Sequence, residues 1–225
     1  MIRAVVFDLD NTLYDYDHCN KIAEEILLSV ISKEFDISVS EAGHLLKNAK
    51  SNVKRILGDG VAASHNRLLY MQNICEQCMQ NPFRYAMKFY DTYWDCFLEH
   101  MTAFDHVIPV MDQLKKRGIV IGIITDLTAH IQYRKIAKLG LQDYIDHIVT
   151  SEEAGIEKPG RRIFELMLQK MELQPEEVLM VGDNIKKDII GARDVGMHGI
   201  LFERNEKDMR KLILDFIEDK GEKDV

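Results

Sequence analysis

Short runs of β-branched residues recur along the chain, and stretches with helical periodicity separate most of them. The runs predict strands at residues 2–7, 119–124, 145–150, 178–181 and 198–202. Apolar residues repeat at helical spacing over roughly 107–117, 129–139, 161–172, 186–195 and 206–219. Strands that alternate with helices of this length predict βαβ units, and therefore a parallel sheet with helices on both faces.

The stretch from about residue 15 to 100 breaks this alternation, because it contains no convincing strand. Its apolar residues repeat at helical spacing instead, and Asn81-Pro82 separates the last two helical patterns. Aromatic residues concentrate in the last pattern, where we expect them to form core: Tyr85, Phe89, Tyr93 and Trp94. The pattern predicts an α/β protein with a Rossmann-like parallel-sheet core, residues 1–14 and 101–225, and an inserted all-helical domain, residues 15–100.

Composition narrows the class of protein. The 225 residues include 29 Lys and Arg against 37 Asp and Glu, a net charge of −8 that argues against binding to a nucleic acid polymer. No apolar stretch approaches the ~20 residues of a membrane helix, and the apolar run before Asp8 is too short for a signal peptide. Four cysteines are too few for a disulfide scaffold. We therefore expect a cytoplasmic protein without a membrane partner. It is expected to be a monomer or a homodimer. The charged tail 218–225 is expected to fray.

Polar side chains that suit phosphate and metal chemistry follow the predicted strands: Asp8, Asp10, Thr125, Lys158, Asp183 and Asp188. In a parallel sheet, ligands bind beyond the carboxyl ends of the strands, so these side chains are expected to gather at one edge. Carboxylates that crowd together repel one another unless a cation joins them. All-oxygen ligands suit Mg²⁺, and a cation beside a lysine and a hydroxyl suits a phosphoryl group.

Two aspartates two positions apart can divide the work of a phosphoryl transfer. Asp8 would attack phosphorus to give an aspartyl-phosphate, while Asp10 protonates the leaving alcohol and later activates water. Taken alone, each motif also reads as ordinary turn or helix-cap chemistry, and Lys158 as a surface lysine. Their order along the chain, each at a strand end or an adjoining turn, favours a metal-assisted phosphohydrolase.

The four ordered motifs resemble those of the haloacid dehalogenase (HAD) superfamily, and the inserted helical domain resembles its C1-type cap. The motifs are Phe7-Asp8-Leu9-Asp10-Asn11-Thr12-Leu13, Thr125, Lys158-Pro159 and Gly182-Asp183-Asn184 with Asp188. The resemblance implies that Asp8 is the nucleophile and Asp10 the general acid/base, whose backbone carbonyl also binds Mg²⁺. It implies that Thr125 and Lys158 hold the phosphoryl group, that Asp8 and Asp183 bind Mg²⁺, and that Asp188 supports the metal site.

Two residues refine what the resemblance implies. The dehalogenases of this superfamily lack the second aspartate of the first motif, so Asp10 points to phosphate esters and disfavours dehalogenation. Many relatives carry Asn after the hydroxyl of the second motif, where this chain has Asp126. A bound phosphate would repel that carboxylate unless it points away or caps the helix that starts near Thr128.

Three further residues are candidates for contact with the substrate: Tyr14, His18 and Arg67. Tyr14 and His18 follow the nucleophile, where this superfamily keeps a mobile flap. Arg67 lies in Ser64-His65-Asn66-Arg67 and could meet a second anionic group. For that segment the pattern favours the alternative, a solvated helix start with Ser64 as N-cap.

The sequence thus indicates a Mg²⁺-dependent phosphatase that hydrolyses a small phosphorylated metabolite, with a cap that closes over the site and selects the leaving group. The opening, residues 7–14, is similar to that of some pyrimidine nucleotidases, which favours a nucleoside monophosphate. Phosphoglycolate and a sugar phosphate follow closely. A phosphomutase with the same aspartyl-phosphate chemistry and a non-catalytic binding protein on the same fold remain alternatives.

Overall fold

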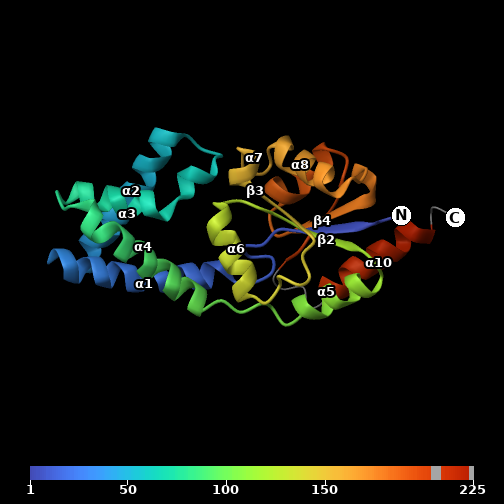
Figure 1. Cartoon of the computed structure of the whole chain (residues 1–225), viewed down its shortest axis with the longest axis horizontal. Helices are drawn as coiled ribbons and strands as arrows, with labels where there is room; N and C mark the ends of the chain where they lie inside the picture. The colour runs from blue at the N-terminus through green and yellow to red at the C-terminus, as the bar shows by residue number, and fades with distance from the viewer. Residues whose placement is uncertain (204–208, 223–225) are drawn as a thin grey trace. The chain divides into compact units, whose positions relative to one another are not determined.

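The computed structural model describes residues 1–203 and 209–222, and its chain forms two compact units (Figure 1). The core unit comprises Met1–Asp15 and Thr102–Val225, and the helical unit comprises Tyr16–Met101. The fold class predicted from the sequence is confirmed, because a parallel sheet carries a helical insertion after its first strand. Within the described ranges, no helix combines the length and apolar character needed to cross a membrane.

Within the described residues, the core unit contains one five-stranded sheet in the order β3-β2-β1-β4-β5. The strands are β1 (Ala4–Phe7), β2 (Val120–Thr125), β3 (His147–Thr150), β4 (Val178–Gly182) and β5 (His198–Leu201). All four strand pairs are parallel, with Val5 opposite both Ile121 and Leu179. β1 therefore occupies the centre of the sheet, and the carboxyl ends of all five strands lie along one edge.

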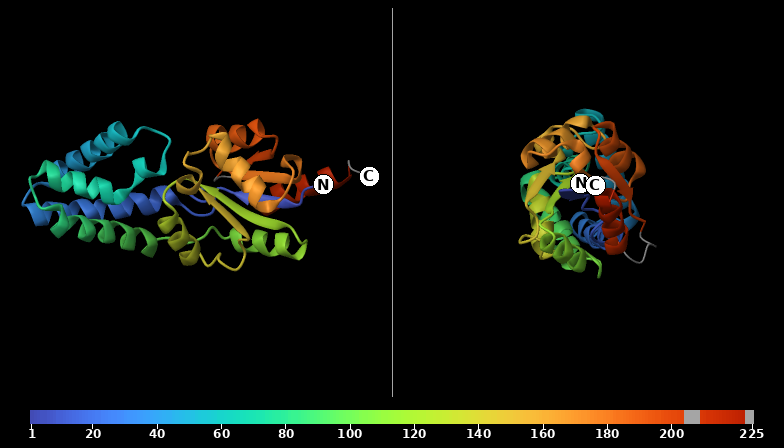
Figure 2. Two further views of the ribbon diagram at one scale, coloured as in Figure 1. Left: turned by 45° about the horizontal axis from the view of Figure 1, so that its top comes forward. Right: turned by 90° about the vertical axis from the view of Figure 1, so that its right-hand side faces the viewer.

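Helices cover both faces of this sheet, as Figures 1 and 2 show for α8 and α5. The helices and short turns of the core unit are α5 (Val107–Lys116), α6 (Ala129–Lys138), α7 (Ser151–Ala154), α8 (Arg161–Met171), η2 (Pro175–Glu177), η3 (Ile185–Ile190), α9 (Gly191–Asp194) and α10 (Met209–Glu222). Side chains alternate along each strand, so Val6 and Met180 pack with Phe164 and Met167 of α8 on one face. β1 and β4 are buried throughout, which explains their continuous apolar sequence.

The helical unit packs four helices around an aromatic core. They are α1 (Tyr16–Phe35), α2 (Val39–Leu57), α3 (Arg67–Gln77) and α4 (Pro82–Glu99), with the short turn η1 (Ala62–His65) before α3. The expected core aromatics are confirmed: Phe89, Tyr93 and Trp94 are buried, and Tyr85 packs against Phe35 and Phe89.

Short polar side chains set the beginnings of three of these helices. Ser38 and Glu41 form a reciprocal capping box at the start of α2. Asn81 caps α4, whose first residue is Pro82, so the predicted break between the last two helices is confirmed. The expected N-cap at Ser64 is wrong. Ser64 is buried inside η1, and the side chain of Asn66 accepts the first hydrogen bond of α3 from the Leu68 N–H.

Three element bounds also differ from the sequence-based expectation. The third strand begins at His147, because Ile145 and Asp146 belong to the preceding turn and to its hydrogen bonds. The pattern at 186–195 forms a π-helical turn, η3, followed by α9. The tail expected to fray from Glu218 is helical as far as Glu222, where α10 ends; residues 223–225 lie outside the described part.

Candidate active site

The first candidate residue, Asp8, follows the central strand directly. Its backbone N–H donates to Val181 O across β4, at 2.9 Å, so the sheet ladder continues into the site. The side chain is buried, and Oδ2 accepts a hydrogen bond from Thr12 Oγ1 at 3.1 Å. Asn11 has φ 67°, which lets the chain reverse tightly and return Thr12 to the strand end. The local sequence Asp8-Leu9-Asp10-Asn11-Thr12 therefore forms a compact turn around its own first carboxylate.

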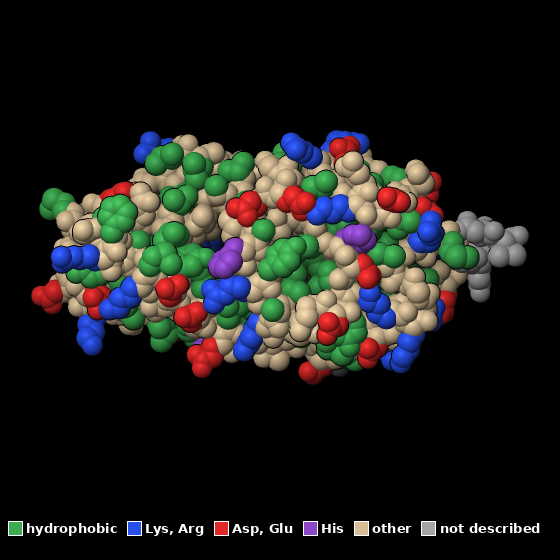
Figure 3. All heavy atoms as spheres, in the orientation of Figure 1, with side chains coloured by type: hydrophobic (Ala, Val, Ile, Leu, Met, Phe, Trp, Pro, Cys, Tyr) green, Lys and Arg blue, Asp and Glu red, His purple; other side chains and the backbone are tan. Residues whose placement is uncertain are grey.

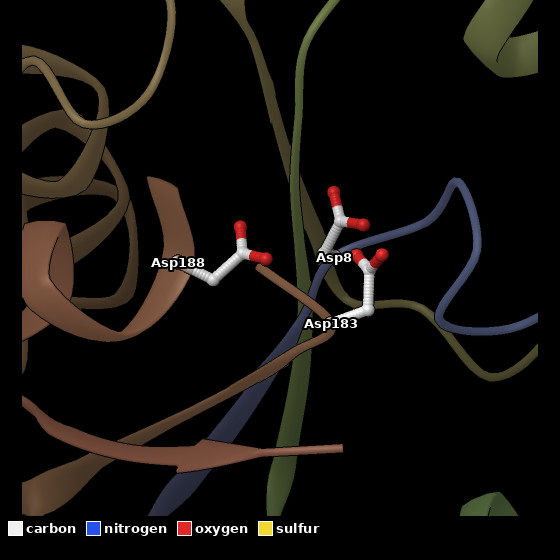
Figure 4. Close-up of side chains that lie close together, drawn as sticks. All are labelled: Asp8, Asp183 and Asp188. Carbon is white, nitrogen blue, oxygen red and sulfur yellow. The ribbon is translucent and has the colours of Figure 1, made fainter. Parts of the chain in front are cut away.

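Two further carboxylates converge on Asp8, as Figure 4 shows. Asp183 follows β4, and Asp188 lies in the π-helical turn η3. One oxygen from each of Asp8, Asp183 and Asp188 lies within 4.8 Å of the other two. Gly182 permits this approach, because a Cβ at that position would stand only 2.5 Å from Asp188 Cγ. Asn184 N–H fixes Asp188 Oδ2 from the other side, at 2.9 Å.

Lys158 supplies a positive charge to this cluster. Its ammonium donates to Asp8 Oδ1 and, at 2.6 Å, to Asp188 Oδ1, and the side chain is 3% exposed. Burial alone would lower the pKa of Lys158, but the carboxylates of Asp188 and Asp8 outweigh it and raise that pKa well above its ordinary value. Lys158 is therefore a permanent cation between two buried acids.

The three carboxylates fit a divalent cation. Burial raises the pKa of Asp8 well above its ordinary value, although Lys158 opposes the shift, and burial together with Asp188 raises the pKa of Asp183. The charged forms of these acids thus need more positive charge than Lys158 supplies. Hard oxygen ligands in a partly buried cluster are what Mg²⁺ prefers, and Asp8, Asp183 and Asp188 are the side chains able to hold it.

Asp10 is held apart from this cluster by a different lysine. Lys135 of α6 donates to Asp10 Oδ1 at 2.8 Å and to Oδ2 at 2.9 Å, and Tyr14 Oη donates to Oδ1 at 2.6 Å. Lys135 and Tyr14 are both fully buried. The carboxylate of Asp10 therefore points to Lys135, and the metal role that the sequence assigned to Asp10 concerns its backbone carbonyl.

Thr125, the last residue of β2, is supported by a second side chain of α6. Gln132 Nε2 donates to Thr125 Oγ1 at 2.5 Å and to Asp126 O at 2.7 Å, and the Gln132 side chain is fully buried. The Thr125 oxygen accepts the amide hydrogen, and its hydroxyl donates its own proton to Asp126 O at 3.3 Å. Ile123 of β2 is opposite Phe7 of β1, so Thr125 ends the neighbouring strand two residues beyond that pair, at the same edge of the sheet as Asp8.

Asp126 neither faces away into solvent nor caps α6. Its Oδ1 accepts the backbone N–H of Lys158 at 3.0 Å, and its Oδ2 accepts Lys187 Nζ at 2.8 Å. The first turn of α6 is satisfied instead by Glu152, which accepts the Ala129 N–H at 2.7 Å. Asp126 thus anchors the loop that carries Lys158, and Lys187 balances its charge.

Comparison with models of known protein families shows which family this chain belongs to. The profile of haloacid dehalogenase-like hydrolases matches residues 2–196, most of the chain. The chain belongs to this hydrolase family. The superfamily expected from the motifs is therefore confirmed, and the motif residues Asp8, Thr125, Lys158 and Asp183 all lie within the matched range.

Two curated relatives of this HAD-like hydrolase are phosphatases by name. One is the ribulose-1,5-bisphosphate 5-phosphatase of Halopiger xanaduensis, 37% identical over 209 residues that span 92% of this chain and 87% of the relative. The other is the glyceraldehyde 3-phosphate phosphatase of Methanothermobacter thermautotrophicus, 31% identical and spanning 89% of this chain and 85% of the relative. The expected class, a phosphoric monoester hydrolase, is confirmed at this level.

Solved structures share the fold of this HAD-like hydrolase. A HAD phosphatase from Thermococcus onnurineus matches with a TM-score of 0.73 and 22% identity, over 95% of this chain and 98% of that one. The HAD-hydrolase YfnB from Bacillus subtilis, solved bound to magnesium, matches with a TM-score of 0.68 and 20% identity, over 96% and 97%. Identities this low show a common fold alone.

The three residues predicted to contact the substrate of this HAD-like hydrolase, Tyr14, His18 and Arg67, lie in different parts of the structure. Tyr14 contacts Asp10, as described, whereas His18 is exposed in the first turn of α1. Arg67 is buried in the helical unit, where it donates to Tyr16 Oη at 2.6 Å and to His65 O at 2.8 Å. Its guanidinium also lies over the rings of Tyr70, Tyr93 and Trp94, 5.5 to 5.7 Å from their centroids.

Sequence reasoning missed three residues that the structure brings to this edge: Gln132, Lys135 and Lys187. The sequence contained a signal for Gln132 and Lys135. Along 129–139 the apolar face contains Ile131 and Ile136, and Gln132 and Lys135 fall on that same face at helical spacing. Polar residues on the buried face of an amphipathic helix require partners, so they mark a polar site. Lys187, on the turn after Asp183, carried no such signal.

Proposed function

We propose that this HAD-like hydrolase is a Mg²⁺-dependent phosphatase of small sugar phosphates that works through an aspartyl-phosphate on Asp8. The observation that carries the mechanism is the convergence of Asp8, Asp183, Asp188 and Lys158 at the carboxyl edge of the sheet, with Asp10 held on a separate lysine. The magnesium reported for YfnB supports the choice of metal.

The cycle begins with an attack by an Asp8 carboxylate oxygen on phosphorus. The bond between phosphorus and the ester oxygen breaks, its electron pair stays on that oxygen, and Asp10 supplies the proton that completes the alcohol. Lys158 and Thr125 stabilise the charge on the transferring group. A bound Mg²⁺ supplies further charge neutralisation and favours the ionised form of Asp8.

The second half of the cycle regenerates the enzyme. Asp10, now a carboxylate, takes a proton from a water molecule, and the resulting oxygen attacks phosphorus of the aspartyl-phosphate. The bond between phosphorus and Asp8 breaks, which returns the Asp8 carboxylate and releases inorganic phosphate. Protons and electron pairs balance over the two steps, and no other reactant is required.

The activities by which the two relatives are named indicate which class of substrate to test first. Both relatives described above act by name on a phosphorylated sugar, so a sugar phosphate replaces the nucleoside monophosphate as the first candidate. The phosphomutase needs the same residues, and the same assay separates it. A mutase moves labelled phosphate between hydroxyls of the substrate and releases little free phosphate.

The decisive test is phosphate release from glyceraldehyde 3-phosphate, ribulose 1,5-bisphosphate, phosphoglycolate, a nucleoside monophosphate and an aryl phosphate, with Mg²⁺ or EDTA. We expect activity that EDTA abolishes and Mg²⁺ restores, highest with a sugar phosphate. Asp8→Asn is expected to reduce kcat by at least about 10³-fold, because it removes the nucleophile.

The matched control is Asp143→Asn, an exposed aspartate of the core unit, which should keep wild-type activity. Undiminished turnover in Asp8→Asn would overturn the mechanism. A nucleoside monophosphate as the best substrate by kcat/KM would overturn the sugar-phosphate assignment alone.

A further inference from the structure

Lys135 is a buried lysine in the core unit that the proposed cycle does not yet use. It lies on the inward face of α6 with a side chain that is 0% exposed, between Gln132 and the apolar residue Ile136. Removing an ammonium from water costs several kcal/mol unless it is paired and hydrogen-bonded. A neutral residue would fill this position without that cost, so the charge points to a function.

Hydrogen bonds connect Lys135 with Asp10, the candidate acid/base. Its ammonium donates to both carboxylate oxygens of Asp10, at 2.8 and 2.9 Å, and lies 5.9 Å from the ring centroid of Tyr14. The Tyr14 hydroxyl donates to Oδ1 of the same carboxylate at 2.6 Å. Asp10 and Tyr14 also form an isolated backbone bridge, which fixes both ends of this contact.

We propose that Lys135 and Tyr14 are positioning residues that fix the Asp10 carboxylate, so that Oδ2 is the atom which carries the proton of the reaction. Oδ1 accepts from both Lys135 and Tyr14, whereas Oδ2 receives a donor only from Lys135 among the residues that the structure describes. A carboxylate oxygen accepts two hydrogen bonds with ease, so Oδ2 retains a lone pair for a proton.

The geometry explains why two donors are used. A free aspartate rotates about both of its side-chain torsions, whereas proton transfer needs a heavy-atom distance of about 2.6 to 3.2 Å to the reacting oxygen. The two hydrogen bonds from Lys135 to Oδ1 and Oδ2 fix the plane of the Asp10 carboxylate. Tyr14 makes the two oxygens different, because it donates to Oδ1. The remaining partly exposed face of Asp10, whose side chain is 21% exposed, is left for the reaction.

This inference rests on the proposed phosphatase function, and leaving-group dependence separates the two. An aryl oxide leaves without much help from an acid, whereas an alkoxide requires a proton. We therefore expect Lys135→Met to lower kcat about 100-fold for a sugar phosphate and about 10-fold or less for an aryl phosphate, with KM within about threefold of wild type. Lys138→Met, an exposed lysine of the same helix, is the matched control and should match wild type on both substrates.

A double-mutant comparison shows whether Lys135 acts through Asp10. In an Asp10→Asn background, Lys135→Met should lower kcat by less than about threefold, because the group that it positions is already gone. A lysine that only stabilises the fold would lower kcat by the same factor in both backgrounds. Equal losses on the sugar and aryl phosphates in Lys135→Met would also overturn the proposal.

Tyr14→Phe covers the case in which Lys135→Met does not fold. It removes one hydroxyl and keeps the buried ring, so it should reproduce the preference for aryl over sugar phosphate at about 10-fold. Unchanged relative rates on the two substrates would overturn the role of Tyr14. If wild-type protein hydrolyses neither substrate, or if Asp8→Asn retains full activity, the phosphatase proposal itself fails.

Discussion

Around Asp8, single side chains determine a local charge imbalance. Three carboxylates, Asp8, Asp183 and Asp188, face one ammonium, that of Lys158, which leaves two formal negative charges. Other acids lie nearby: Asp10 pairs with Lys135, and Lys187 is shared between Asp126 and Glu157. Among the three candidate metal ligands and Lys158, the formal excess of two negative charges equals in size the charge of a divalent cation.

Gly182→Ala tests this arrangement with one methyl group. The new Cβ would stand 2.5 Å from Asp188 Cγ, so the Asp188 side chain or the adjoining backbone must shift, which disturbs the three-carboxylate cluster. We expect the Mg²⁺ concentration for half-maximal activity to rise at least about 10-fold, in line with losses at residues that orient metal ligands. Titration of activity with Mg²⁺ measures it.

Gly43→Ala in α2 is the control for Gly182→Ala, because the nearest atom to its added Cβ is Leu28 Cδ1, at 3.9 Å. It should leave the Mg²⁺ requirement unchanged. An identical requirement in Gly182→Ala and wild type would contradict the proposed packing of Asp188 against the strand end.

Asp146 joins three elements of the core unit, α5, β2 and β3. It precedes β3 and accepts the Ile121 N–H at 2.8 Å and Lys115 Nζ at 2.6 Å. Partial burial alone would raise the pKa of Asp146, but these two donors outweigh it and lower the pKa below its ordinary value. The charged form is thus favoured in the folded protein, which links stability to pH.

Asp146→Asn should therefore destabilise the protein in a pH-dependent way. A lowered folded pKa adds stability above the unfolded pKa of about 3.9, and that stability is lost as pH falls through the folded pKa. We expect a loss of about 1 kcal/mol at pH 7, kept small by partial exposure, that narrows below about pH 4. Urea unfolding from pH 7 to 3.5 measures it, and a difference independent of pH would contradict the assignment.

Local signals made the elements of the core unit predictable, whereas long-range contacts were not. Runs such as Val5-Val6 indicate buried strands by themselves, and parallel topology then brings Asp8, Thr125 and Asp183 to one edge. The place of Lys135 on the buried face of α6 indicates that it needs a polar partner, but the contact with Asp10 spans 125 positions, so the sequence does not identify that partner. Asp126 was recognised as unusual, but its partner Lys187 lies 61 positions away, so its anchoring role had no sequence signal.

Over the whole molecule, the excess of Asp and Glu over Lys and Arg gives little information about the candidate active site around Asp8. Figure 3 shows Lys and Arg side chains interspersed with Asp and Glu over the visible face, with no broad patch of one sign. The net charge of −8 is therefore mainly a property of the surface. In the proposed function, a small anion would instead interact with local charges, those of Lys158 and a bound cation, in a cluster that the composition cannot reveal.

Mg²⁺ should raise the stability of the entire protein, because binding to the folded state alone shifts the unfolding equilibrium. A Mg²⁺ concentration 100 times the Kd is expected to add about 2.7 kcal/mol to the free energy of unfolding. Asp183→Asn should lose most of this gain, while remaining at least as stable as wild type in EDTA, because one of the repelling carboxylates is gone.

Thermal and urea unfolding at constant ionic strength, with Na⁺ in place of Mg²⁺ as the reference, measure both effects. Asp143→Asn should keep the full gain. An equal gain in Asp183→Asn would contradict the proposed metal site without bearing on the aspartyl-phosphate chemistry.

The central position of β1 has a consequence for the order of synthesis. Asp8 is synthesised before its partners, because Lys158 lies 150 positions later and β4, the strand that precedes Asp183, lies later still and pairs with β1. A nascent chain that stops before β4 therefore holds Asp8, the proposed nucleophile, and Lys158, but it lacks Asp183 and Asp188. Because such non-local contacts form only after the intervening chain exists, the proposed site can assemble only once the chain has been synthesised as far as Asp188.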